Sequence, residues 1–260
     1  MPSEKLELLG KGLYSNIPDT ITVSSIPTSS ELDYVSSEDF ESTMLDTIFP
    51  KAIEEKCNWR DLLEVDFYWI CRCMRILNYG PYYTTNAIFC SNCGRTTGEY
   101  SVDLRSIECK PINISGVNEI TISKDEFIEF NSDIKIKLLT IQEKLNSEKD
   151  PAFMLANGKR NRQLAKICYS VTAIKGKTNL TPLEVKLIIE KDMSASDYLI
   201  FKECFEEATN FGLRAGGSTT CPKCGNKDAA FISLVDDRFL HPTMGDLRRW
   251  KADVRSKRNN

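Results

Sequence analysis

Cys90-Ser-Asn-Cys93-Gly94 and Cys221-Pro-Lys-Cys224-Gly225 are two copies of one short motif, and they decide how this chain folds. Two residues between the cysteines allow both sulfurs to face one point about 2.3 Å away, which is the zinc–thiolate distance, and four such sulfurs close a tetrahedral site. The glycine after each pair permits the positive φ that a tight turn requires. The sequence therefore predicts one structural zinc ion bound by Cys90, Cys93, Cys221 and Cys224.

A single Cys-x-x-Cys pair has two other interpretations, a redox-active pair and a disulfide. Two similar copies, each leading into a run with strand character, favour zinc over both. A site closed by four thiolates has no open position for water, so the ion is expected to stabilise the fold and to perform no chemistry. Arg95, Lys223 and Lys227 lie beside the motifs and would offset the negative charge of the zinc–thiolate centre.

The composition is that of an ordinary globular protein, with 260 residues, 41% of them hydrophobic and 27% charged. No segment approaches the roughly 18 uninterrupted apolar residues of a membrane span, and the N-terminus does not have the residue order of a signal peptide. We therefore expect no membrane span and a reducing cytoplasm. The remaining cysteines are then expected to be buried thiols, although a role of Cys109 as a metal ligand stays open: Cys57, Cys71, Cys73, Cys109, Cys168 and Cys204.

The strongest helix pattern runs from about Trp59 to Tyr79 and should stop at Gly80-Pro81. Its apolar residues occupy most faces, which predicts a helix surrounded by protein. Arg72 or Arg75 is expected to pair with Asp66 or Glu64 of the same helix. A second clear start is Thr181-Pro-Leu-Glu184, a capping box with proline at the first helical position.

The predicted fold class is α+β: mostly helical, with a small antiparallel zinc-ribbon-like sheet whose two halves flank a helical insertion. Strand-like runs at 82–89, 99–104, 119–122 and 134–139 are expected to form that sheet around the metal. These patterns divide the chain into six segments. The first three are an extended N-terminal arm (1–35), N-terminal helices (36–81) and the first zinc-ribbon half with further strands (82–139); the helices are expected to begin at a Ser36 or Ser37 cap. The last three are the helical insertion (140–215), the second zinc-ribbon half (216–240) and a basic C-terminal tail (241–260).

The region around the first motif resembles the T4-type bacteriophage baseplate hub assembly proteins. The motifs that carry the resemblance are Asp66-Phe-Tyr-Trp69, Leu77-Asn-Tyr-Gly-Pro81, Phe89-Cys-Ser-Asn-Cys-Gly94 and Val102-Asp-Leu104. The match covers residues 42–112 and 219–236, so the acidic arm and the basic tail inherit no role from it. The resemblance implies a tail morphogenesis protein in the host cytoplasm that assembles with other tail or baseplate hub proteins. It would act either during assembly or as a structural part of the virion baseplate.

Two other classes of function remain to be weighed. A zinc ribbon can bind nucleic acid, and here Arg248, Arg249 and neighbouring basic residues would contact phosphates while Trp250 stacks on a base. The formal net charge of −3 opposes this alternative and favours a solvated tail helix. An enzyme is disfavoured because His241 is the only histidine and no phosphate-binding loop is present. We therefore expect no catalytic activity, and we interpret Glu206-Glu207 and Asp236-Asp237 as surface charge.

Overall fold

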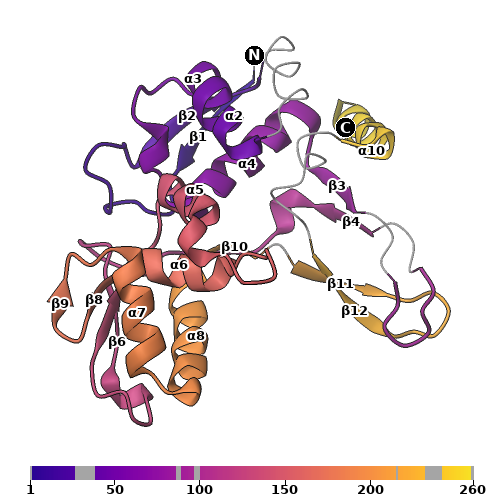
Figure 1. Ribbon diagram of the computed structural model, residues 1–260. Coiled ribbons are helices and arrows are strands. Elements are labelled where there is room, and N and C mark those ends of the chain that lie inside the picture. The colour runs from indigo at the N-terminus through magenta and orange to yellow at the C-terminus, as the bar shows by residue number, and fades with distance from the viewer. Residues whose placement is uncertain are drawn as a thin grey trace.

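The computed structural model describes residues 2–26, 39–85, 89–96, 100–214, 216–231 and 242–258. These residues form a mixed α+β fold with several small antiparallel sheets, as the sequence predicted (Figure 1). Its apolar side chains gather in two hydrophobic cores, one built around a long helix near the N-terminus and one inside the segment between the two cysteine motifs. We call them the first core and the second core.

The long helix α4 (Glu64–Tyr79) is the centre of the first core, and most of its faces are covered. Around it lie α2 (Phe40–Thr43), a π-helical turn (Met44–Ile48), α3 (Phe49–Ala52) and α5 (Ile141–Lys149). The helix ends at Gly80, whose φ of 79° confirms the predicted stop. Its start lies later than predicted, because residues 59–61 form a separate 3₁₀ turn. The 3₁₀ turns are Trp59–Asp61, Leu104–Ser106, Lys124–Glu126 and Pro151–Phe153.

The predicted pairing of charges within α4 was wrong. Arg75 instead reaches Asp246 near the C-terminus, with 3.8 Å between nitrogen and oxygen, and Arg72 donates to the carbonyl of Leu104. The Asp66 carboxylate accepts from the backbone amides of Leu9 and Gly10 and from the Tyr14 hydroxyl. Because these groups lie on different faces of α4, each is satisfied by the segment that covers its own face.

Residues 3–24 do not form the extended arm that we predicted. They form a hairpin of β1 (Ser3–Glu7) and β2 (Thr20–Ser24), and Leu6, Ile21 and Val23 are buried against the first core. The short alternation of apolar residues in each strand is too weak a pattern to predict a strand, and a two-stranded hairpin is stable only when it packs on something else. Residues 27–35 of the predicted arm lie outside the described residues, as do Ser36 and Ser37. The cap of α2 is Asp39, which accepts from the Ser42 amide.

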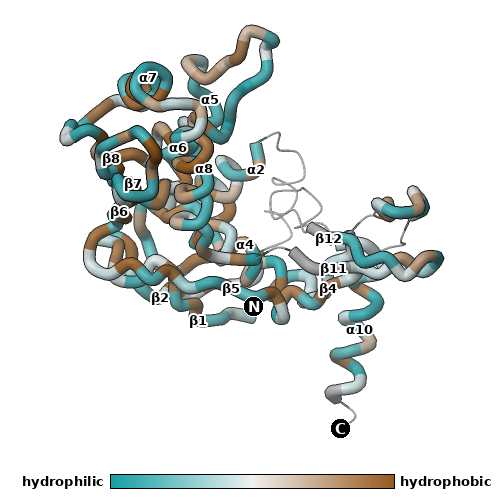
Figure 2. The backbone as a smooth tube through the Cα atoms, turned by 90° about the horizontal axis from the view of Figure 1, so that it is seen from below, coloured by the Kyte–Doolittle hydropathy of each residue, from teal (hydrophilic) through white to brown (hydrophobic). Residues whose placement is uncertain are grey.

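The segment between the motifs begins and ends with two strands that pair with each other. Strand β5 (Cys109–Lys110) pairs with β10 (Gly212–Leu213), so the chain enters and leaves the second core through two adjacent strands. This core consists of a four-stranded sheet and three helices, and Figure 2 shows hydrophobic stretches gathered where they meet. Its elements are β6 (Ile120–Ile122), β7 (Ile134–Ile136), β8 (Val171–Ile174), β9 (Lys177–Thr178), α6 (Arg162–Ser170), α7 (Pro182–Asp192) and α8 (Ala195–Thr209).

The expectation that β6 and β7 belong to a sheet around the metal was therefore wrong. They pair in the order β6-β7-β8-β9, and the isoleucines of β7 are fully buried in the second core. Strand β8 was missed because it is short and lies directly after a helix. The capping box at Thr181 is confirmed, with the Thr181 hydroxyl accepting from the Glu184 amide.

A buried carboxylate organises the end of the second core. Asp197, in the first turn of α8, is fully buried and accepts from the backbone amides of Ile128, Glu129 and Phe130. Burial opposes its charge, but these amides and the Ser194 hydroxyl outweigh burial and hold the pKa of Asp197 below its ordinary value. One acidic side chain thus fixes both the start of α8 and the loop before β7.

The predicted basic tail is a docked helix, α10 (Met244–Arg258). Trp250 lies directly over Gly80, because a Cβ at that glycine would be 2.3 Å from the indole ring. Asp246 is buried, pairs with Arg75 and accepts from the Thr84 hydroxyl at 2.6 Å. Within the described residues, no helix is long and apolar enough to cross a membrane.

Candidate metal centre

Two hairpins carry the cysteine motifs at their tips and project together from the body of the molecule (Figure 1). The first pairs β3 (Tyr82–Thr85) with β4 (Tyr100–Asp103), and the second pairs β11 (Gly216–Thr220) with β12 (Lys227–Phe231). The predicted strands therefore exist, although the first was expected to be longer and residues 86–88, 97–99 and 232–241 lie outside the described residues.

The two motifs fold into the same turn, which we call a knuckle. In the first knuckle the Cys90 amide donates to the Arg95 carbonyl and the Gly94 amide to the Cys90 carbonyl, at 2.8 and 2.9 Å. In the second, Cys221 and Gly225 make the equivalent bonds at 2.8 and 2.9 Å. Gly94 and Gly225 have φ of 66° and 72°, which confirms the conformation predicted for them. The repeat in the sequence is thus a repeat in structure.

The four cysteine sulfurs converge between the knuckles and lie within 4.8 Å of one another. The sulfur of Cys90 is 3.6 Å from that of Cys224, and the sulfur of Cys93 is 3.7 Å from that of Cys221. Four sulfurs arranged tetrahedrally at about 2.3 Å from one ion are about 3.8 Å apart, whereas a disulfide requires about 2.05 Å. The arrangement can therefore hold one metal ion, and its spacing fits a tetrahedral thiolate site.

The electrostatics of the cluster favour a bound cation. Backbone amides of Cys224 and Lys223 point at the Cys221 sulfur and lower its pKa to about 6. At Cys90 the amides of Cys93 and Asn92 also favour the thiolate, but the adjoining Cys224 thiol and burial oppose them and raise the pKa to about 12. Thiolates so close together repel one another, and a cation at their centre removes that repulsion.

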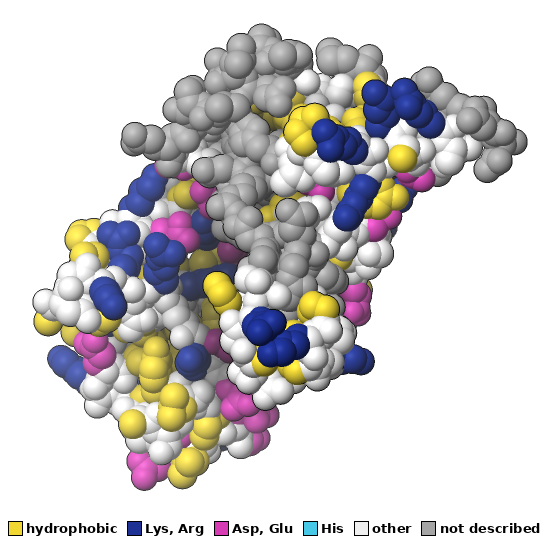
Figure 3. Space-filling model, turned by 90° about the vertical axis from the view of Figure 1, so that its right-hand side faces the viewer, with side chains coloured by type: hydrophobic (Ala, Val, Ile, Leu, Met, Phe, Trp, Pro, Cys, Tyr) yellow, Lys and Arg dark blue, Asp and Glu magenta, His cyan; other side chains and the backbone are white. Residues whose placement is uncertain are grey.

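The cluster is closed on one side and open on the other. Cys90 and Cys221 are 2% and 1% exposed, whereas Cys93 is half-buried and Cys224 is exposed. Figure 3 views the molecule from the side toward which the hairpins project in Figure 1, and Lys and Arg side chains are visible there. Arg95, Lys223 and Lys227 are exposed. That they offset the charge of the thiolates remains a prediction from the sequence.

All ten cysteines lie within the described residues and are free thiols. Cys109, whose role was left open, sits half-buried in β5 opposite Leu213 and is not part of the metal-binding cluster. Cys71, Cys73 and Cys168 are buried, as predicted, whereas Cys57 and Cys204 are half-buried. Sequence reasoning did not single out Ser91, Asn226 and Asp228, which lie beside the cluster. Their only signal was that they are polar residues in or next to a motif.

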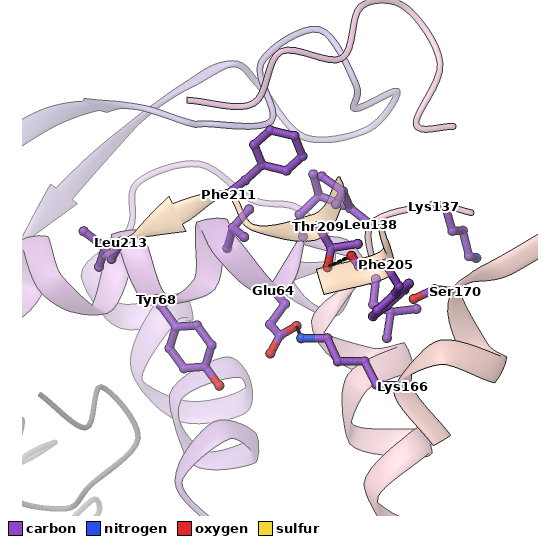
Figure 4. Close-up of a pocket in the computed structure, with 13 residues that line it drawn as sticks. Glu64, Tyr68, Lys137, Leu138, Lys166, Ser170, Phe205, Thr209, Phe211 and Leu213 are labelled. Atoms are coloured by element: carbon purple, nitrogen blue, oxygen red, sulfur yellow. Dashed lines mark hydrogen bonds and ion pairs between the residues drawn. The ribbon is translucent and has the colours of Figure 1, made fainter. Parts of the chain in front are cut away.

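A separate pocket of about 160 Å³ lies where the two cores meet, and its lining includes Glu64, Tyr68, Lys166 and Phe205 (Figure 4). Glu64 from α4 and Lys166 from α6 form an ion pair across it at 2.8 Å. This ion pair links a helix of the first core to a helix of the second core. Glu206 and Glu207 are exposed on α8, as predicted, whereas Asp236, Asp237 and His241 lie outside the described residues.

The chain was compared with known proteins in three ways. No family model, no curated protein and no solved structure matches it. The likeness to baseplate hub assembly proteins consequently rests on the motifs in the sequence, and the metal centre rests on its own geometry.

Proposed function

We propose that Cys90, Cys93, Cys221 and Cys224 bind one structural zinc ion and that the chain is a non-enzymatic structural or assembly protein of a bacteriophage tail baseplate hub. The observation that carries the zinc site is the convergence of four sulfurs from two hairpins, with Cys90 and Cys224 separated by 134 residues. The motifs between Val65 and Leu104 support the role in tail assembly. The setting would be the host cytoplasm during assembly and, if the protein is retained, the virion.

In this proposal the two hairpins are the halves of one zinc ribbon, and the second core is an insertion between them. The pairing of β5 with β10 supports this, because it brings the chain back beside its point of departure before the second knuckle. A site with four thiolates leaves no position for a substrate or a reactive water. The surfaces of the two cores and the hairpins would then serve to contact neighbouring tail proteins.

Metal content is the direct test of the zinc site. Purified wild-type protein should contain one zinc per chain, and Cys221→Ser should lose it together with the amide dispersion of residues 89–96 in the first knuckle. Cys109→Ser is the matched control and should keep the ion, because Cys109 is outside the cluster. Two zinc ions per chain, or zinc retained by Cys221→Ser, would contradict a shared site.

The proposed role in tail assembly needs a separate measurement. Co-expression with the hub and tape-measure proteins of the same phage should give a complex that co-purifies and survives gel filtration. A stable monomer that binds none of them would contradict the proposal.

One observation favours a second candidate, a nucleic-acid-binding protein. Four basic side chains of helix α10 are exposed: Arg248, Arg249, Lys251 and Arg255. Trp250, however, packs on Gly80 and is not free to stack on a base. Titration with single- and double-stranded DNA and RNA at low salt distinguishes the candidates, since phosphate contacts weaken steeply as salt rises.

A further inference from the structure

Three polar side chains link the two knuckles beside the cysteine cluster. We call Ser91, Asn226 and Asp228 the bridging triad. Ser91 lies in the first knuckle, directly after Cys90, whereas Asn226 and Asp228 follow the second knuckle. Every hydrogen bond between Ser91 and the other two therefore crosses from one hairpin to the other.

Asp228 is the centre of the triad. Its Oδ1 accepts from the Ser91 hydroxyl, from the Ser91 amide at 3.3 Å and from the Asn226 side-chain amide at 3.1 Å. Only 9% of Asp228 is exposed, and its Oδ2 is buried with no hydrogen-bond partner among the described residues. A buried carboxylate normally costs stability unless its hydrogen bonds repay the loss of water. Here those bonds are made largely to the opposite knuckle.

Asn226 contacts both knuckles at the level of the cysteines. Its backbone carbonyl accepts from the Cys221 amide at 2.8 Å. Its side-chain amide lies 3.1 Å from the Ser91 hydroxyl and 3.9 Å from the Cys90 sulfur. Cys90 and Cys221 are the two buried cysteines of the cluster, so Asn226 contacts the buried cysteine of each knuckle.

We propose that the bridging triad positions the two knuckles so that the four sulfurs are assembled before a metal ion binds. The inference rests on the proposed zinc site and extends it to residues that do not touch the ion. Binding to a preorganised site does not have to bear the entropy of ordering two separate loops. Groups that orient metal ligands typically change metal affinity by about 10- to 100-fold when they are substituted.

The charge of Asp228 does not explain its position. A zinc ion with four thiolates carries a net charge of about −2, so a carboxylate nearby disfavours the loaded site electrostatically. Its hydrogen bonds favour the site. The charge of Asp228 should weaken zinc binding, whereas its hydrogen bonds should strengthen it. Comparing Asp228→Ala with Asp228→Asn separates these two contributions to zinc affinity. Asparagine keeps an oxygen that accepts from Ser91 and removes the charge, whereas alanine removes both.

The test measures zinc affinity by competition with a chromophoric chelator, on the full chain. Asp228→Ala should bind zinc about 10- to 100-fold more weakly, Ser91→Ala should also be weaker, and Asp228→Asn should recover most of the loss. The Co²⁺ form of each variant should keep the absorption of a four-thiolate site, because the ligands are unchanged. Asp133→Ala is the control and should match wild type, since Asp133 is an exposed carboxylate that accepts one backbone amide outside the hairpins.

Wild-type affinity in both Asp228→Ala and Ser91→Ala would overturn the role of the triad. Asp228→Asn as weak as Asp228→Ala would also overturn it, because the carboxylate charge would then matter more than the cross-hairpin bonds. If Asp228→Ala does not fold, Ser91→Ala decides, since Ser91 is exposed and its loss leaves no large cavity. Wild-type protein that binds no zinc would instead refute the zinc site itself.

Discussion

Removing the carboxylate of Asp246, which lies in α10, should destabilise the packing of α10 on α4 because it leaves Arg75 of α4 without its counterion. Arg75 is fully buried, and its guanidinium donates to the carbonyls of Gly80 and Tyr82 at 2.9 and 2.8 Å. Asp246 supplies the anion 3.8 Å away, and burial lowers the pKa of Arg75 to about 10 in spite of it. In Asp246→Ala the cation would remain buried without a counterion.

Breaking a buried ion pair by removing one partner costs about 3–5 kcal/mol. Asp246 also accepts from the Thr243 amide at the start of α10, and loss of such a cap costs about 1 kcal/mol. Water that enters beside Arg75 offsets part of this, so we expect a loss of about 4 kcal/mol in total. That is a large fraction of the roughly 5–15 kcal/mol that stabilises a typical domain.

The assay is urea unfolding followed by tryptophan fluorescence, which reports on the first core through Trp59 and Trp69. The double variant Arg75→Met with Asp246→Leu is the matched control. It removes both charges, so no buried ion is left without a partner, and it should recover most of the lost stability. A loss below about 1 kcal/mol in Asp246→Ala, or a double variant no more stable than the single, would refute the reasoning.

Three further predictions concern other parts of the fold. Gly80→Ala should strain the backbone by about 1–3 kcal/mol and displace Trp250, so trypsin should cleave α10 faster than in wild type; an unchanged cleavage rate would contradict the docking. Thr181→Ala should cost about 1 kcal/mol through loss of the cap of α7, measured as a lower melting temperature; no change would show that the cap contributes nothing. Because the pKa of Asp197 is lowered on folding, its contribution to stability is present above its unfolded pKa of about 3.9 and is lost as pH falls through the folded pKa. Acid unfolding of Asp197→Asn should therefore depend less on pH than that of wild type.

The features that the sequence predicted best are those set by local chemistry. Gly80 terminates α4 and Thr181 caps α7 through groups a few residues away. The local sequence is therefore sufficient to predict both helix ends. The knuckles are equally local, and their repetition pointed to the shared cluster. The capping box at Thr140 and Glu143 has the same character, and attention to spacing could have found it.

The features that the sequence did not predict depend on distant partners. The β1–β2 hairpin is stable because Asp66 and the apolar face of α4 are beside it, and neither fact is visible within residues 3–24. In the same way, the sequence shows Asp246 only as an acidic residue in a basic segment, and its pairing with Arg75 depends on the folded structure. Strands β6 and β7 were recognised, but their partner β8 lies beyond two helices. Pairing between strands so far apart in the sequence depends on how the elements pack, and the spacing of apolar residues within each strand does not contain that information.

The contact between Arg75 and Asp246 also sets an order of events during synthesis. The buried residues of the second core run from Ile122 to Phe205, so this core can form as soon as that segment has left the ribosome. The buried residues of the first core run from Leu6 to Leu145, so this core can form earlier still. The anion that pairs with Arg75 comes only with α10, which at about 5–20 residues per second follows Arg75 by about 10–30 s. Until then the newly made α4 carries a cation without its anion. A chain that lacks Asp246 would therefore keep the Arg75 cation buried at α4 without the carboxylate that pairs with it.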